Sequence, residues 1–254
     1  MNIITSTKNE KIQKIKSLNT SKGRAEQSKF LCEGEHMVEE AINSGKNISS
    51  IVVREDSFER YKNLINKAEA EIIIVSTNVF NSICDTKTPQ GISAVVDMFN
   101  GDMSFSNFVL AMNGVQDPGN VGTIIRTADA AGFTDVLIDA QSADIFNPKT
   151  VRASMGSIFN INCHKTDNML ETLNGLKQKK YAVIGSTLNG DNFYNRQKNL
   201  NKIVLIIGNE GSGINEDVLN ACTHNYKLPM QGKAESLNAA IAAAIMMYDI
   251  INNK

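Results

Sequence analysis

From residue 108 onward, short apolar runs alternate with helix-like segments along the sequence. The apolar runs fall at 108–112, 134–139, 181–186 and 203–207, and the helix-like segments at 119–131, 149–158, 167–179 and 215–221. Alternation at this spacing is typical of strand–helix–strand units, in which the strands run parallel and helices cover the sheet. The pattern predicts an α/β fold with a mainly parallel sheet and helices on both faces. In such sheets, ligands bind in the loops beyond the carboxyl ends of the strands.

The first part of the chain alternates in the same way over shorter distances. The stretches "KFLCEG", "ISSIVVRE", "EIIIVS" and "ISAVVDM" are strand-like, and helix-like segments such as "EHMVEEAINSG" separate them. The polar stretch "FNGDMSFSN" that follows has the composition of a linker. With 254 residues, the chain is long enough to form two hydrophobic cores. We predict a small N-terminal α/β domain over residues 1–98 and a second domain over residues 107–254.

The charge of the whole chain is nearly balanced, with 26 Lys and Arg against 27 Asp and Glu and a formal net charge of −1. This balance excludes a chain-wide basic field of the kind that marks many nucleic-acid binders. The N-terminal segment nevertheless carries a local excess of positive charge. Its basic residues are Lys8, Lys11, Lys14, Lys16, Lys22, Arg24 and Lys29. Two interpretations stay open, namely a local surface for nucleic acid and a helix face that is merely solvated.

The cysteines and histidines favour neither a metal centre nor a cysteine nucleophile. Cys32, Cys84, Cys163 and Cys222 form no C-x-x-C pair, and the three histidines do not complete a ligand set at zinc spacing. We therefore expect reduced structural thiols and no metal. The sequence has no apolar run of membrane-spanning length and no signal-peptide core. We accordingly expect a cytoplasmic protein with no membrane partner.

Three segments each combine a strand-like run, a loop of small and polar residues, and the start of a helix. They are "NGVQDPGNVGTIIRTADAAGF" (113–133), "IVLIIGNEGSGI" (203–214) and "YKLPMQGKAESLNAAIAAAI" (226–245). The first lacks the Lys-Ser/Thr of a P-loop, and "GNEGSG" does not fit G-x-G-x-x-G, so a nucleoside triphosphate is disfavoured. The loops instead supply backbone N–H and C=O groups beside an apolar wall. That arrangement suits a flat adenine and a ribose better than a pyrophosphate.

Together the three segments resemble the motifs of the SpoU/TrmH family of RNA ribose 2′-O-methyltransferases, within the SPOUT superfamily. The matching patterns are N…DP-x-N-x-G-x-x-x-R-T-A, then L-x-x-G-x-E-x-x-G, then L-P-M…S-L-N-x-x-x-A. The stretch "NPKTVRASMGSIF" (147–159) also resembles a family segment, and residues 1–98 resemble the appended RNA-binding domain. The resemblance implies a C-terminal trefoil knot, S-adenosyl-L-methionine as methyl donor, an RNA substrate and a homodimer.

The resemblance also implies roles for individual residues. The catalytic residues of the family correspond here to Asn120, Arg126, Glu210, Ser236 and Asn238. The methyl donor is expected to bind against three loops, at Ser186, Thr187, Leu188, Asn189, Ile207, Gly208, Asn209, Gly213, Leu228, Met230, Ser236 and Leu237. RNA contacts are expected from Lys8, Lys11, Lys14, Arg24, Arg126 and Arg152.

Arg126 is the residue whose chemistry can be argued from first principles. Methyl transfer to a ribose hydroxyl requires in-line placement of the oxygen and a means of favouring the alkoxide. Because a guanidinium is almost always protonated, we expect Arg126 to act electrostatically and to hold the neighbouring phosphate, although action as a base is the family's alternative. Apolar neighbours such as Ile124, Ile125 and Ala128 give Arg126 a buried-looking setting. The alternative is that Arg126 is an ordinary surface residue of the helix, with no role in the site.

The other site residues also have structural interpretations. Glu210 fits a helix cap or an ion pair, Asn120 a turn after Pro118, and Asn238 a helix start. For the whole chain, a 2′-O-methyltransferase acting on 23S rRNA is the leading hypothesis. The alternatives are a transfer-RNA 2′-O-methyltransferase, a non-catalytic RNA-binding or ribosome-assembly protein of the same fold, and a generic nucleotide-dependent enzyme.

Overall fold

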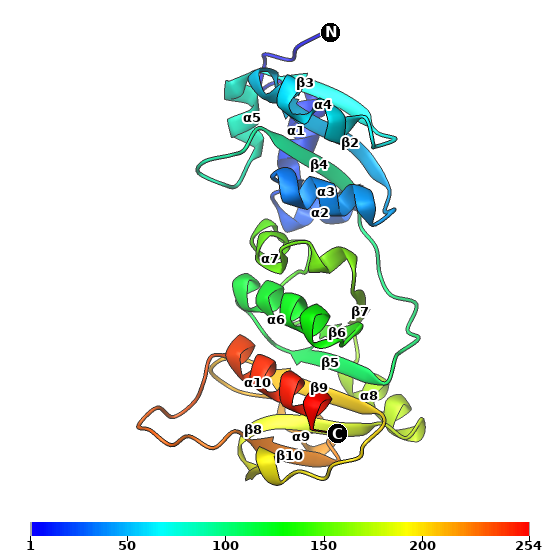
Figure 1. Cartoon of the computed structure of the whole chain (residues 1–254), viewed down its shortest axis with the longest axis vertical. Helices are drawn as coiled ribbons and strands as arrows, with labels where there is room; N and C mark the ends of the chain where they lie inside the picture. The colour runs from blue at the N-terminus through cyan, green and yellow to red at the C-terminus, as the bar shows by residue number, and fades with distance from the viewer. Residues whose placement is uncertain (1, 254) are drawn as a thin grey trace. The chain divides into compact units, whose positions relative to one another are not determined.

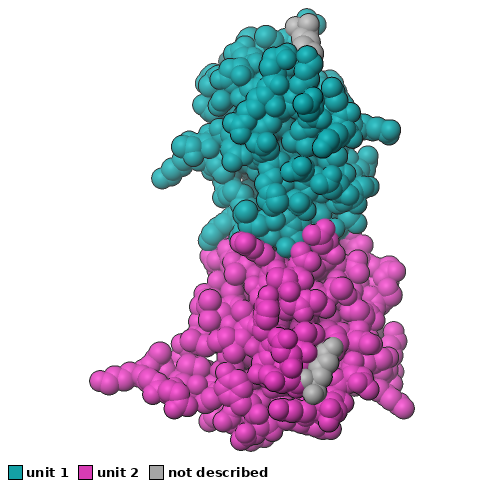
Figure 2. Space-filling view, in the orientation of Figure 1, with its two compact units in different colours: residues 1–99, 144–159 teal, residues 100–143, 160–254 magenta. Residues whose placement is uncertain are grey.

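The computed structural model describes residues 2–253, and the chain divides into two compact units (Figure 2). Unit 1 comprises residues 1–99 and 144–159, and unit 2 comprises residues 100–143 and 160–254. Met1 and Lys254, the outermost residues of the two predicted domain ranges, lie outside the described residues. The predicted range 107–254 includes residues 144–159, whose contacts place them in unit 1.

Unit 1 is built on a mixed four-stranded sheet in the order β1 (Lys29–Glu33), β4 (Ile92–Asp97), β2 (Ile48–Arg54) and β3 (Glu71–Val75). β2 and β3 are parallel, whereas β4 runs antiparallel to both of its neighbours. These strands are the four that the apolar runs predict. The helices are α1 (Glu10–Ser17), α2 (Ser21–Gln27), α3 (Glu35–Asn43), α4 (Phe58–Ile65) and α5 (Thr77–Ile83), with the short 3-10 helix η1 (Glu55–Ser57).

The segment 144–159 joins unit 1 through helix α7 (Pro148–Ser154), which packs against β1. Asn147 caps the helix start with its side chain, and Met155 ends the helix in the left-handed conformation at φ 49°. Phe146, and Phe159 of η2 (Ser157–Phe159), lie against Phe30 of β1, with ring centroids 4.7 Å and 6.2 Å away. Burial of these rings therefore fixes the segment to the first sheet rather than to the second.

Unit 2 is built on a six-stranded sheet. Its strands are β5 (Phe108–Asn113), β6 (Asp135–Asp139), β7 (Asn162–Thr166), β8 (Ala182–Asn192), β9 (Ile203–Gly208) and β10 (His224–Lys227). From edge to edge the order is β10-β8-β9-β5-β6-β7, and every neighbouring pair is parallel. The predicted parallel sheet is thus confirmed. The edge strand β7 is additional to the apolar runs, because its sequence "NCHKT" is largely polar. The edge strand β10 overlaps the strand-like start of segment 226–245 at Tyr226 and Lys227.

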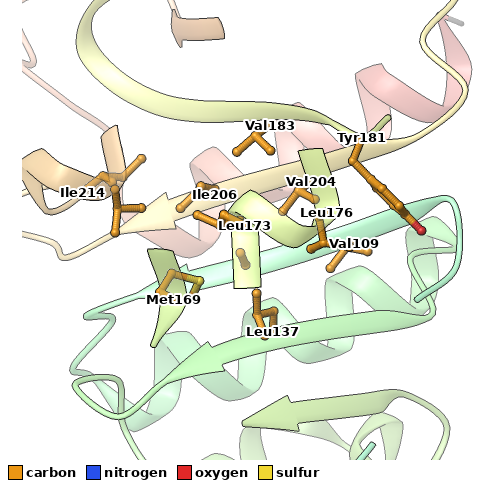
Figure 3. Close-up of a cluster of buried hydrophobic side chains, with 12 residues drawn as sticks. Val109, Leu137, Met169, Leu173, Leu176, Tyr181, Val183, Val204, Ile206 and Ile214 are labelled. Atoms are coloured by element: carbon orange, nitrogen blue, oxygen red, sulfur yellow. The ribbon is translucent and has the colours of Figure 1, made fainter. Parts of the chain in front are cut away.

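Helices cover both faces of this sheet, as predicted. They are α6 (Pro118–Ala131), α8 (Met169–Gln178), α9 (Glu216–Asn220) and α10 (Ala239–Asn252), and η3 (Phe193–Asn195) follows β8. Figure 1 shows α6 and α10 side by side on one face, and the two helices pack on each other. On the other face, Leu173 and Leu176 of α8 meet Val109, Val183 and Val204 of three strands (Figure 3). The trefoil knot stays a prediction.

No helix formed by residues 2–253 combines the length and the apolar composition that are needed to cross a bilayer.

Candidate active site

A cleft of about 490 Å³ lies in unit 2, where the loops after β9 and β10 meet the middle of β8. All the residues that the sequence assigns to the methyl donor line it, namely Ser186, Thr187, Leu188, Asn189, Ile207, Gly208, Asn209, Gly213, Leu228, Met230, Ser236 and Leu237. Further lining residues were not predicted as donor contacts, namely Glu210, Gly211, Ser212, Ile214, Leu219, Glu235, Ala239 and Ala242. Most of these are sequence neighbours of predicted residues, so the signal was their place in the same loops.

The loop after β9 is curled tightly by hydrogen bonds within the loop, and its residues line the cleft. The backbone N–H groups of Asn209 and Gly213 each donate to the carbonyl oxygen of the other, at 2.9 Å and 3.0 Å. The Asn209 carboxamide oxygen accepts from N of Gly211 and N of Ser212. A Cβ at Gly208 would lie 2.3 Å from the carbonyl carbon of Gly213, and Gly213 has φ +73°. Glycine is therefore required at both ends of the curl.

Asn120, Glu210 and Asn238 form one hydrogen-bonded chain. Asn238 Nδ2 donates to Asn120 Oδ1 at 3.0 Å, and Asn120 Nδ2 donates to Glu210 Oε1 at 2.8 Å. The backbone N of Gln116 also donates to Glu210 Oε2, at 3.4 Å. These contacts bring one residue from each of the three motif segments together.

Helix starts hold the two asparagines of this chain. The Asp117 side chain caps α6 and accepts from the backbone N of Asn120 at 2.9 Å. Asn238 is itself the N-cap of α10, and its oxygen accepts from N of Ala240 and N of Ile241. The helix-start interpretation of Asn238 is therefore correct, and the same side chain still donates to Asn120.

The pKa of Glu210 lies below its ordinary value. Partial burial acts to raise this pKa, but hydrogen bonds that the carboxylate accepts, above all from the Asn120 amide, outweigh the burial and lower it. Glu210 is thus an ionised acceptor at neutral pH, and it belongs both to the hydrogen-bonded chain and to the lining of the cleft.

Two of the five predicted catalytic residues lie outside the hydrogen-bonded chain. Ser236 lines the cleft but is exposed, and among the described residues it has no hydrogen-bond partner. Arg126 is exposed on α6, and no ion pair or hydrogen bond to another described residue holds its side chain. The buried setting suggested by its apolar sequence neighbours is therefore wrong. Ile125 and Ala128 face the core, and at 100° per residue Arg126 points away from that stripe.

The predicted RNA-contacting residues also differ in exposure. Lys8 and Lys14 are exposed, and Lys11 is exposed but paired with Glu71 at 2.5 Å. Arg152 is one-third exposed and pairs with Asp85 at 2.8 Å.

Arg24 is a correction, because only 2% of its side chain is accessible. Its guanidinium donates to the Leu18 carbonyl at 2.9 Å and pairs with Asp144 at 2.8 Å. A buried guanidinium that is satisfied in this way ties α2 to the segment 144–159 and leaves little surface for RNA.

The cysteines are free thiols, with Cys32 and Cys163 buried and Cys84 and Cys222 partly buried. Burial raises the pKa of Cys32 to about 12 and the pKa of Cys222 to about 11. A thiolate nucleophile at neutral pH is therefore disfavoured at these two positions. Within residues 2–253, no cluster of three or more His, Cys, Asp or Glu is arranged to hold a metal ion.

Two family models match the chain. The model described as the SpoU rRNA Methylase family matches residues 107–248, and the MRM3-like substrate binding domain matches residues 9–94. The chain is 38% identical to the 23S rRNA (guanosine(2553)-2'-O)-methyltransferase RlmP of Bacillus subtilis, over 98% of this chain and 99% of that protein.

Solved structures agree over almost the whole length. The AdoMet-bound rRNA methyltransferase from Sinorhizobium meliloti is 28% identical, with a TM-score of 0.89 over 99% of this chain and 97% of that chain. The SpoU methyltransferase AviRb from Streptomyces viridochromogenes, in complex with AdoMet, shares the fold at 24% identity. Its TM-score is 0.88 over 96% of this chain and 98% of that chain.

Proposed function

Because this chain belongs to the SpoU rRNA methylase family, we propose that it transfers a methyl group from S-adenosylmethionine to a ribose 2′-hydroxyl of 23S rRNA. The hydrogen-bonded chain of Asn120, Glu210 and Asn238 beside the unit 2 cleft is the observation that carries the proposal. The matching rRNA enzyme aligns over nearly all of both chains, which favours ribosomal over transfer RNA. We keep residues 1–98 as the RNA-binding domain and residues 107–254 as the methyltransferase domain.

The cleft has the size and the chemistry for the methyl donor. About 490 Å³ lies within the range of sites for cofactor-sized ligands. Leu188, Leu228 and Met230 offer apolar surface for an adenine, while the lining stretch 186–189 also offers polar side chains. S-adenosylmethionine supplies an electrophilic methyl group when it is bound.

The remaining chemistry belongs to side chains of this protein. Glu210 fixes the orientation of the Asn120 amide, and Asn238 fixes its other end, so these groups need little reorganisation during the reaction. The exposed guanidinium of Arg126 is available to an RNA phosphate and to the ribose hydroxyl. We propose that its fixed charge favours the alkoxide and positions the oxygen, and that it does not act as the base.

A homodimer and a cytoplasmic location are part of this proposal. Helix α10 exposes apolar side chains, with Ile241 51% and Tyr248 45% accessible, and burial of such a surface favours self-association. Sedimentation analysis of the protein and of Ile241→Arg tests the dimer. The location follows from the proposed substrate, since a ribosomal RNA enzyme must meet that RNA.

Mapping of 2′-O-methyl groups in total RNA, with and without the gene, tests the function. We expect one site in 23S rRNA to lose its methyl group, and we expect the purified protein to restore it with S-adenosylmethionine. Loss of a methyl group in transfer RNA alone would favour the transfer-RNA enzyme. No change in any RNA, together with no transfer in vitro, would favour the non-catalytic alternative.

A further inference from the structure

A second cavity, of about 270 Å³, lies wholly within unit 1. Its walls come from the start of α3, from the loop between α5 and β4, and from α7. The lining residues that the argument uses are Glu33, Met37, Pro89, Ile92, Arg152 and Met155. No role of these residues follows from the chemistry of the unit 2 cleft.

Apolar side chains form much of the lining. Met37 and Ile92 are almost fully buried, at 5% and 1% accessible, while Met155 is 47% accessible. Pockets for drug-sized ligands start at roughly 300 Å³, so this cavity suits a smaller group. Apolar surface of this kind fits the face of a flat ring.

The polar groups of the cavity leave one conspicuous donor. The Glu33 carboxylate accepts from N of Asp85 at 2.7 Å and from the Thr86 hydroxyl at 2.8 Å, which shapes the loop. Arg152 Nη2 pairs with Asp85 Oδ2 at 2.8 Å. Its Nη1, in contrast, is buried and has no hydrogen-bond partner in the protein. A buried N–H group of a charged side chain is costly to leave unpaired, so an acceptor that a ligand brings to the one-third accessible Arg152 side chain would be favoured.

We propose that this cavity binds one unstacked nucleobase of the RNA substrate, with Arg152 Nη1 donating to an acceptor on the edge of the base. The inference rests on the proposed function, and the match of residues 9–94 to a substrate binding domain supports it. Unstacked bases that are read along their edges are the usual targets of sequence-specific RNA recognition. A phosphate is a poorer occupant, because Glu33 and Asp85 place two carboxylates beside the single guanidinium.

Methyl NMR of the full-length protein, saturated with S-adenosylhomocysteine, tests the binding directly. We expect ribonucleoside 5′-monophosphates to shift the methionine methyl resonances of Met37 and Met155 with millimolar affinity, while ribose 5-phosphate does not. Met230 lines the unit 2 cleft and serves as the internal control, whose resonance should stay in place. The absence of shifts with all four nucleotides, or equal shifts with ribose 5-phosphate, would overturn the proposal. This measurement requires no turnover, so it stays separate from failure of the proposed function.

Kinetics with two variants test the same site during RNA recognition. Arg152→Gln should raise KM for RNA about tenfold or more, with kcat and S-adenosylhomocysteine affinity unchanged. Met155→Ala, at an exposed position, should raise KM for RNA several-fold. This second variant tests the cavity even if Arg152→Gln misfolds. The matched control is Arg60→Gln, since exposed Arg60 also pairs with a carboxylate at 2.8 Å but does not line the cavity.

The variants have clear opposing outcomes. An unchanged KM in both cavity variants would overturn the proposal. A raised KM for Arg152→Gln without nucleotide-induced methyl shifts would also overturn it, since Arg152 would then act by holding Asp85 and its loop.

Discussion

The polar residues proposed to act on RNA are held in two different ways. Asn120, Glu210 and Asn238 bond to one another and to helix starts, so their positions are set before any ligand binds. Lys14 and Arg126 are exposed, and no hydrogen bond or ion pair to another described residue holds their side chains. The first group therefore offers preorganised geometry, and the second offers charge that adapts to the substrate. A substitution in the first group should therefore also alter cofactor binding in the cleft, whereas a substitution in the second group should leave cofactor binding unchanged.

The largest effect is expected from Arg126→Ala. Removal of a charge that acts on the reacting oxygen should lower the single-turnover rate about a hundredfold to a thousandfold. Affinity for S-adenosylhomocysteine, measured by calorimetry, should be unchanged, because this side chain does not line the cleft. Arg126→Lys should remain impaired, since it keeps the charge and loses the planar fork. Near-normal turnover of the Lys variant would show that charge alone is sufficient.

Asn120→Ala should have a smaller but broader effect. The variant leaves Glu210 without its 2.8 Å donor and frees the Asn238 amide. We expect turnover to fall about tenfold to a hundredfold. Unlike Arg126→Ala, this variant should also weaken S-adenosylhomocysteine binding, because Glu210 lies in a loop that lines the cleft. Equal cofactor affinity in both variants would contradict the distinction between the hydrogen-bonded residues (the held group) and the exposed cations (the free group).

The Glu210 carboxylate adds a pH dependence to the held group. Its pKa is lowered in the folded protein, so its contribution to stability is present above the ordinary carboxyl pKa and is lost as pH falls through the folded value. The free energy of unfolding of the wild type should therefore fall faster in acid than that of Glu210→Gln. The effect should be small because the side chain is largely exposed. Parallel urea curves between neutral pH and acid, with Glu235→Gln as the control, measure it.

The sequence predicted the second sheet and the cleft because both depend on local patterns. Apolar runs mark the central strands of the sheet, whereas cleft residues such as Ser186 and Leu228 were placed by the resemblance of the motif loops to those of the family. The edge strand β7 could not be placed in this way, because an edge strand with one neighbour need not be apolar.

The predictions were wrong for two arginines, because the sequence does not show which face of a helix a side chain occupies or which distant residue it pairs with. Arg24 belongs to a basic segment, but its fate is set by Asp144, which lies 120 positions further along the chain. Arg126 has apolar neighbours in the sequence and an exposed face in the helix. The unit 1 cavity was not predicted for a similar reason. Arg152 and Met155, which line it, lie far along the sequence from the rest of its lining.

The smallest effect is expected from three exposed lysines in α1 and just before it, which belong to the free group. Lys8, Lys14 and Lys16 are exposed, whereas Lys11 is paired with Glu71 and is left unchanged. Replacement of all three by Gln should weaken RNA binding only a few-fold at physiological salt, because each phosphate contact contributes through counterion release. The slope of log affinity against log salt should fall by about one for each lysine that contacts a phosphate. Cofactor affinity and the single-turnover rate at saturating RNA should not change. Lys62→Gln, on an exposed face of α4, is the control with one charge removed elsewhere in unit 1. An unaltered salt slope in the triple variant would show that these three lysines only face solvent. Of the exposed cations compared here, Arg126 alone would then keep a proposed role in RNA contact.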